Sequence, residues 1–221
     1  MILLLDSFEL SKLKRKYGDE KVLVVPRNLL NGVPDKFHKG NLNKALASNI
    51  FLANTFIYRY EAEYNNAFYQ LIPYIIVTNK KEDKFYVTER ISGEERLKGR
   101  YQLGASGHVN PIDLDINNTL ENAAFREMNE ELFIKDSNEK LYYYGTVQDS
   151  YSKTNEHLGI VYIYHCDNVS VREEDNLNGK WLDIFSLFSK YELFESWARL
   201  IIDHLYQNYT KTKKTLILNK K

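Results

Sequence analysis

The sequence predicts a mixed α/β protein in which helices pack on a sheet. Several short apolar or alternating segments, typical of strands, lie on both sides of one amphipathic helix over residues 119–132. Two further helical segments follow toward the C-terminal end of the chain. Strands around a central helix, followed by more helices, are typical of layered α/β architectures.

With 221 residues, the chain is long enough for one large domain with an appended piece. We expect residues 1–66 to form an N-terminal extension packed on the main domain, and residues 67–209 to form that domain. Residues 210–221 are expected to be a lysine-rich C-terminal tail whose charges are solvated.

The elements of the extension are the hardest to assign. The segment KVLVVPR, residues 21–27, predicts a short buried strand that ends at Pro26, since proline cannot donate to a ladder. Residues 42–52 predict a helix. The alternation of residues 56–70 favours a strand.

The pattern becomes clearer after this point. Residues 71–79 are an apolar, β-rich run, the polar residues 80–83 form a turn, and residues 84–90 alternate with period two. The small residues of YQLGASGHV, residues 101–109, indicate a strand or bend that another group approaches closely.

The central helix covers roughly residues 119–132. Asn118, followed three residues later by Glu121, is typical of a capping box at its start. Residues 141–149 and 158–165 predict two more strands, joined by a polar segment. Two helices are then expected, over residues 181–188 and residues 191–209.

Composition excludes several classes of function. Lys+Arg and Asp+Glu are equal at 30 each, so the net charge of +0 gives no general attraction to nucleic acid or anionic membranes. Cys166 is the single cysteine and is expected in the core, so a cysteine-based zinc site is excluded. The five histidines are scattered, without metal-ligand spacing. No apolar run approaches the roughly 20 residues that cross a bilayer, and a cytoplasmic protein is expected.

Three glutamates of the central helix carry the functional prediction. Glu127, Glu130 and Glu131 occupy an arc of about 100° on the helix. Like charges at these spacings each cost a few tenths of a kcal/mol, and the helix dipole adds roughly 0.3–1 kcal/mol in the last turn. Arg126 can pair with Glu130 but cannot balance three carboxylates. A divalent cation would balance them, although a solvated acidic face without a metal is the simpler alternative.

This helix resembles the signature helix of the Nudix hydrolases. The signature reads G-x5-E-x7-R-E-U-x-E-E-x-G-U, where U is a bulky aliphatic residue. The residues on its R, E, U, E, E and final U positions are Arg126, Glu127, Met128, Glu130, Glu131 and Ile134. Upstream, the segment GASGHV resembles the strand end that opens the signature. The resemblance covers roughly residues 70–205 and implies an α/β/α sandwich with a mixed sheet.

Two positions depart from the signature. Asn118 stands where the family has its first glutamate, and the loop from Gly107 is five residues longer, so Asp113 or Asp115 is the alternative acid. Phe133 replaces the second glycine, and the turn after the helix is therefore expected to differ.

The resemblance implies a hydrolase that cleaves the pyrophosphate of a nucleoside diphosphate derivative by water attack at phosphorus. Glu127, Glu130 and Glu131 would hold Mg²⁺, with Mn²⁺ as an alternative, and Arg126 would orient this cluster. The backbone of Gly107 would lie close to the metal-bound phosphate.

The general base varies within the family. Glu127 and Glu131 are candidates on the helix, and Glu156 is a candidate outside it, although a solvated turn residue is the favoured interpretation of Glu156. His108, next to Gly107, is more readily interpreted as a hydrogen-bonded structural histidine.

Three alternatives remain. The altered loop allows a non-catalytic Nudix-fold module that binds a nucleotide or regulates a partner. Isoprenoid diphosphate isomerisation would need a reactive cysteine, which Cys166 in an apolar strand fits poorly. The last alternative is a structural charged helix without a metal. The expected partner is a small nucleotide or nucleoside diphosphate derivative, and a homodimer is an open alternative to a monomer.

Overall fold

The computed structural model describes residues 7–30, 33, 35–40, 55–92, 98–115, 117–135, 140–150, 156–172 and 174–218. The chain divides into two compact units. The first unit comprises residues 1–75, 106–128 and 141–162, and the second comprises residues 76–105, 129–140 and 163–221. Three strands, β4, β7 and β10, and one helix, α4, contribute residues to both units.

The first unit begins with a helix and a small group of strands. In chain order, its elements up to the first shared strand are α1 (Ser7–Tyr17), β1 (Lys21–Pro26), η1 (Arg27–Leu30), β2 (Lys36–Lys39), β3 (Thr55–Tyr58), α3 (Arg59–Ala62) and β4 (Phe68–Thr78). It continues with η2 (Pro111–Asp113), α4 (Thr119–Glu131), β9 (Tyr142–Gln148) and β10 (His157–His165). Strand β7 (Ala105–Ser106) lies at the boundary between the units along the chain.

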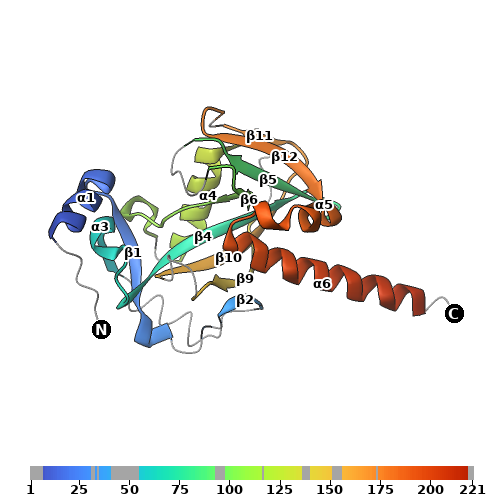
Figure 1. The fold of residues 1–221 in the computed structure, drawn as a ribbon, viewed down its shortest axis with the longest axis horizontal. Coiled ribbons are helices and arrows are strands. Elements are labelled where there is room, and N and C mark those ends of the chain that lie inside the picture. The colour runs from blue at the N-terminus through green and yellow to red at the C-terminus, as the bar shows by residue number, and fades with distance from the viewer. Residues whose placement is uncertain are drawn as a thin grey trace. The chain divides into compact units, whose positions relative to one another are not determined.

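The second unit ends with helices. Its remaining elements are β5 (Lys84–Arg90), β6 (Tyr101–Leu103), β8 (Leu132–Ile134), β11 (Val169–Val171), β12 (Leu177–Asp183), α5 (Ile184–Ser189), η3 (Tyr191–Leu193) and α6 (Ser196–Leu218). Figure 1 shows α5 beside α6, where the rings of Phe188 and Tyr206 stack with centroids 4.2 Å apart.

In the part of the chain that the structure describes, the strands form one ten-stranded sheet and one separate ladder. The order along the main sheet is β12-β5-β4-β10-β9-β2, with β1 paired to β3 and β4, β6 paired to β5, and β7 paired to β4. Strands β8 and β11 form the two-stranded ladder. The α/β fold class predicted from the sequence is confirmed.

Each unit has its own apolar packing. In the first, Val22 and Val24 of β1 pack with Ala62 of α3, and Figure 1 shows α1, α3 and β1 grouped together. In the second, Phe194 is fully buried and meets the ring of Tyr101 edge-on at 5.4 Å. These contacts follow from the apolar faces that the alternating strands and amphipathic helices present.

The continuous strand predicted for residues 56–70 is wrong, because the helical turn α3 interrupts it. Arg59 and Glu63 form an i,i+4 ion pair with Nε and Oε1 3.3 Å apart, and Tyr60 is buried inside the turn. A helical turn brings residues four apart close together, and this ion pair stabilises the turn against the alternating pattern.

The C-terminal helices also differ from the prediction. Strand β12 includes Trp181 and continues to Asp183, so α5 starts three residues later than expected. The side chain of Asp183 accepts a hydrogen bond from Ser186 N at 2.7 Å, which places the N-cap there. Helix α6 continues through the expected tail as far as Leu218.

Other expectations are met or lie outside the described part of the chain. The helix predicted for residues 42–52 lies outside the described residues. Cys166 is fully buried, as expected for a core residue. Among the described residues, none of the helices is both long enough and apolar enough to span a membrane.

Candidate functional site

Helix α4 carries the three glutamates on the predicted segment. Its buried residues, Ala123, Ala124 and Met128, fix one face of the helix against the protein. Glu127, which precedes Met128, is half-buried, and Glu130 is exposed. The helix forms where the sequence predicts it because its small and apolar residues recur at helical spacing.

The chain before the helix is held by Asp115. The side-chain amide of Asn118 donates to Asp115 Oδ1 at 3.2 Å, and Thr119 Oγ1 donates to the backbone oxygen of Asp115. A capping box joins Asn110 and Asp113 one loop earlier, where Asn110 N donates to Asp113 Oδ2 at 2.8 Å. This loop is longer than the corresponding loop of the family signature, and these hydrogen bonds hold its described residues in place.

Gly107 lies directly against the carboxyl group of Glu127. A Cβ atom added at Gly107 would overlap the carboxyl carbon and both carboxyl oxygens of Glu127. Only glycine leaves room for this close approach of a carboxylate to the backbone. The structure thus brings together two of the residues that the sequence predicted for one site.

Arg126 binds Asp113 with two hydrogen bonds. Arg126 Nε lies 2.8 Å from Asp113 Oδ1, and Nη2 lies 2.9 Å from Oδ2. Asp113 is only 4% exposed. Such a bidentate pair is both strong and directional. Of the two alternative acids, Asp113 is the one that contacts the arginine.

The rest of the guanidinium binds Glu127 and the backbone. Arg126 Nη1 lies 2.8 Å from Glu127 Oε1, and Nη2 donates to the backbone oxygen of His108 at 2.7 Å. Hydrogen bonding to Asp113 and the charge of Glu127 raise the pKa of Arg126 above its ordinary value despite burial. Arg126 thus pairs with Glu127, the next residue along the helix.

Glu131, the last residue of α4, has its own polar neighbours. Gln102 Nε2 donates to Glu131 Oε2 at 3.2 Å, and Arg90 Nη2 lies 4.0 Å from Oε1. Arg90 also lies 3.6 Å from Glu195 Oε1 through its Nε atom. The fold therefore supplies a second arginine to the acidic face, which the sequence does not reveal because Arg90 is far away in the chain.

Glu156 is buried, so its interpretation as a solvated turn residue is wrong. It is 1% exposed, and its Oε1 atom accepts from Tyr64 N at 3.5 Å. Its backbone oxygen accepts from Gln70 N at 2.7 Å, which ties the residue to strand β4. Burial raises the pKa of the Glu156 carboxyl. A polar, charged sequence context conceals this burial, which only the pairing of strands creates.

Two of the histidines that are scattered in the sequence meet in the fold. Glu63, His108 and His157 place possible ligand atoms within 4.8 Å of one another, and among the described residues this is the group of three that meets that criterion. The rings of His108 and His157 meet edge-on, with centroids 5.4 Å apart. Burial, with the nearby positive Arg59, holds the pKa of His108 well below its ordinary value.

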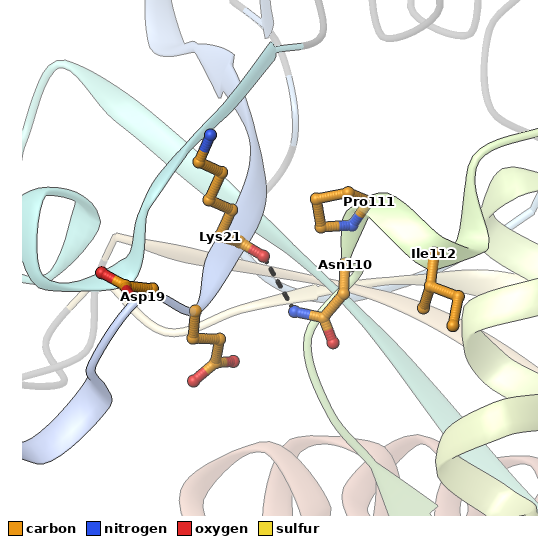
Figure 2. A pocket seen from close by; sticks show the side chains of 6 residues that line it. Asp19, Lys21, Asn110, Pro111 and Ile112 are labelled. Atoms are coloured by element: carbon orange, nitrogen blue, oxygen red, sulfur yellow. Dashed lines mark hydrogen bonds between the residues drawn. The ribbon is translucent and has the colours of Figure 1, made fainter.

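A shallow hollow lies beside the same loop. Figure 2 shows its lining, in which the side-chain amide of Asn110 points to the backbone oxygen of Lys21 and donates to it at 2.9 Å. Ile112 borders the hollow and is largely exposed. None of the glutamates of α4 lines it, so the hollow adds no residue to the candidate site.

Gly107→Ala is expected to lower turnover of a pyrophosphate substrate about 10- to 100-fold with little effect on folding. The added Cβ meets the movable end of Glu127, so the carboxylate is displaced while the backbone stays in place. We expect Tm to fall by less than about 3 °C. Steady-state kinetics and thermal unfolding measure the two effects.

Gly145→Ala provides the contrast. Its Cβ would overlap the backbone oxygen of His38 in the paired strand β2, so this change is expected to lower Tm more than Gly107→Ala does. An equal loss of Tm in both variants would show that Gly107 serves folding and not the placement of Glu127.

Comparisons with known proteins point to one fold. No protein-family profile matches the chain. The chain is 28% identical to Protein YmaB of Bacillus subtilis (strain 168) over 209 residues, which cover 85% of this chain and 98% of that protein. It is also similar to the crystal structure of Tm1382, a protein provisionally described as a Nudix hydrolase. That match has a TM-score of 0.71 and 25% identity, and it covers 84% of this chain and 98% of Tm1382.

Proposed function

We propose that this chain, which has the fold of the Nudix hydrolases, is a metal-dependent enzyme that cleaves the pyrophosphate of a nucleoside diphosphate derivative. The observation that carries the proposal is the placement of the Glu127 carboxyl group. It lies against the Gly107 backbone and is held by Arg126, on the helix that also bears Glu130 and Glu131.

The residues of α4 fit a divalent metal such as Mg²⁺ or Mn²⁺. Hard cations take carboxylate oxygens, and Glu127, Glu130 and Glu131 supply three carboxyl groups within two helical turns. The overlap that a side chain at position 107 would cause shows that the Glu127 carboxyl group occupies the space a side chain would fill. A bound cation would neutralise part of the charge of the pyrophosphate, and it would lower the pKa of a bound water that serves as the nucleophile.

The protein's own groups would orient the reactants. Arg126, anchored by Asp113, fixes the direction of the Glu127 carboxylate. Gly107 lets a phosphate oxygen approach the backbone closely. These residues orient the reacting groups and form no covalent bond with the substrate.

Three carboxyl groups remain candidates for the general base. Glu127 and Glu131 lie on the helix, and Glu156 directly precedes strand β10. The raised pKa of Glu156 favours it as a proton acceptor, because a more basic carboxylate takes a proton from water more readily. A general base must also reach the attacking water. The pH dependence of turnover in Glu156→Gln, compared with that of the wild type, would show whether Glu156 is this base.

One observation favours a second candidate, a Nudix-fold module that binds a nucleotide without cleaving it. Glu127 is paired with Arg126, and Glu131 lies near Arg90, so the fold itself balances part of the acidic charge. A binding module would retain nucleotide affinity without a cation.

Phosphate release across a panel of nucleoside pyrophosphates, coupled to a phosphatase, decides between the two functions. We expect turnover of at least one compound with Mg²⁺ or Mn²⁺ and none after the cation is removed with a chelator. The panel includes a nucleoside triphosphate, a dinucleoside polyphosphate, a nucleotide sugar and ADP-ribose. Nucleotide binding by calorimetry without turnover of any compound would contradict the hydrolase and support the binding module.

A further inference from the structure

We propose that Glu63, His108 and His157 form a second metal site, separate from the glutamates of α4, for a divalent transition metal of the zinc type. Their possible ligand atoms all lie within 4.8 Å of one another. All three residues belong to the first unit of the chain. Nothing in the proposed hydrolysis uses this group.

The fold brings the three side chains together from separate segments. Glu63 ends the helical turn α3, His108 follows strand β7, and His157 is the first residue of strand β10. Ligands of a tetrahedral zinc ion lie about 3.3 Å apart, because each bond is about 2.0–2.1 Å long. Donor atoms within 4.8 Å therefore reach that arrangement through shifts of about 1 Å.

The chemistry of the donors selects a transition metal. Two imidazole nitrogens and one carboxylate oxygen are the ligands of many zinc sites, which keep a fourth position for water. Magnesium and calcium prefer oxygen ligands alone. The group therefore differs in kind from the all-carboxylate face of α4 and is expected to take a different cation.

Polar neighbours hold two of the proposed ligands. His108 Nε2 lies 3.0 Å from Gln70 Oε1, so in the tautomer in which Nε2 donates, Nδ1 has the lone pair that a metal binds. Glu63 Oε1 accepts from Arg59 Nε at 3.3 Å. Contacts of this kind orient metal ligands in known sites.

Gln70, which contacts His108, is a buried residue with one polar atom that has no partner among the described residues. This residue is 0% exposed, and its Nε2 atom is buried with no hydrogen-bond partner in the described part of the chain. An unpaired buried amide costs about 1–3 kcal/mol, so an acceptor is expected beside it.

The surrounding charges permit a dication. Arg59 and Arg126 are positive near His108 and oppose a cation, but each is paired with carboxylates. Arg59 binds Glu20 as well as Glu63, and Arg126 binds Asp113. The opposing charge is therefore largely neutralised within the fold.

The test is a calorimetric titration of the full chain, without a histidine tag, with ZnCl₂ at pH 7. We expect one bound equivalent that is retained in Glu127→Gln and weakened at least about 100-fold in His157→Ala. His165→Ala is the matched control, because His165 pairs with Glu82 elsewhere and its loss is expected to leave zinc affinity unchanged. Co²⁺ added to the wild type is expected to give visible absorption bands of a site with nitrogen ligands, which His108→Ala removes.

Circular dichroism tests whether each variant is folded. Glu63→Gln keeps the side-chain volume and is the second test if His157→Ala unfolds; it too is expected to weaken zinc binding. Absence of a bound equivalent in the wild type would overturn the proposal, as would zinc affinity unchanged in Glu63→Gln and His157→Ala. Loss of binding in Glu127→Gln alone would assign the ion to α4. Because the readout is metal binding, failure here leaves the hydrolase proposal intact.

Discussion

Glu127→Gln is expected to lower kcat for pyrophosphate hydrolysis about 100- to 1000-fold. The substitution keeps the shape of the side chain but removes the negative charge that a divalent cation requires. It also replaces an acceptor of the Arg126 guanidinium by an amide, which weakens the 2.8 Å contact between the two residues. Steady-state kinetics across a range of Mg²⁺ concentrations measure both kcat and the apparent metal affinity.

The matched control lies on the same helix. Glu121→Gln, in the first turn of α4, removes an equal charge outside the proposed site and is expected to change kcat less than about twofold. A similar loss of activity in both variants would mean that helix charge in general, and not metal binding by Glu127, supports turnover. Full activity in Glu127→Gln would contradict the proposed metal site.

Asp113→Ala is expected to destabilise the protein by about 2–4 kcal/mol and to lower kcat as well. The change leaves a mostly buried guanidinium without its bidentate partner and removes the acceptor of Asn110 N. Arg126 is then free to turn away from Glu127, which it now holds. Urea unfolding followed by circular dichroism gives the loss of stability.

Asp115→Ala is the comparison that decides between the two acids of the loop. Asp115 is exposed and accepts only local hydrogen bonds, including those from Asn117 and Asn118, so a cost of about 1 kcal/mol is expected. Equal costs for Asp113→Ala and Asp115→Ala would show that the Arg126 contact adds nothing to stability.

The sequence was sufficient for α4 and for most strands because their signals are local. Helical spacing of Ala123, Ala124 and Met128 and period-two alternation in 84–90 both arise within a few residues. The family resemblance implied that Gly107 lies near the metal-bound phosphate, and the structure places Gly107 against the carboxyl group of Glu127.

Residues brought together over long sequence distances could not be predicted. Arg90 and Glu131 come from different elements, and so do Glu63 and His157, so no spacing rule joins them. The burial of Glu156 depends on how strand β10 meets β4, while its immediate neighbours in the sequence are polar. Such contacts depend on topology, which local patterns do not specify.

Phe133 marks the place where helix α4 passes into strand β8 without an intervening turn. Helix ends normally fray, because their last carbonyl groups have no partner within the helix. Here the backbone oxygen of Glu131 accepts from Arg172 N at 2.8 Å, and residues 132–134 continue directly into the ladder with β11. Opening the last turn of α4 thus requires breaking strand pairing as well, so a carboxylate at the end of a helix keeps a defined direction without a helix cap.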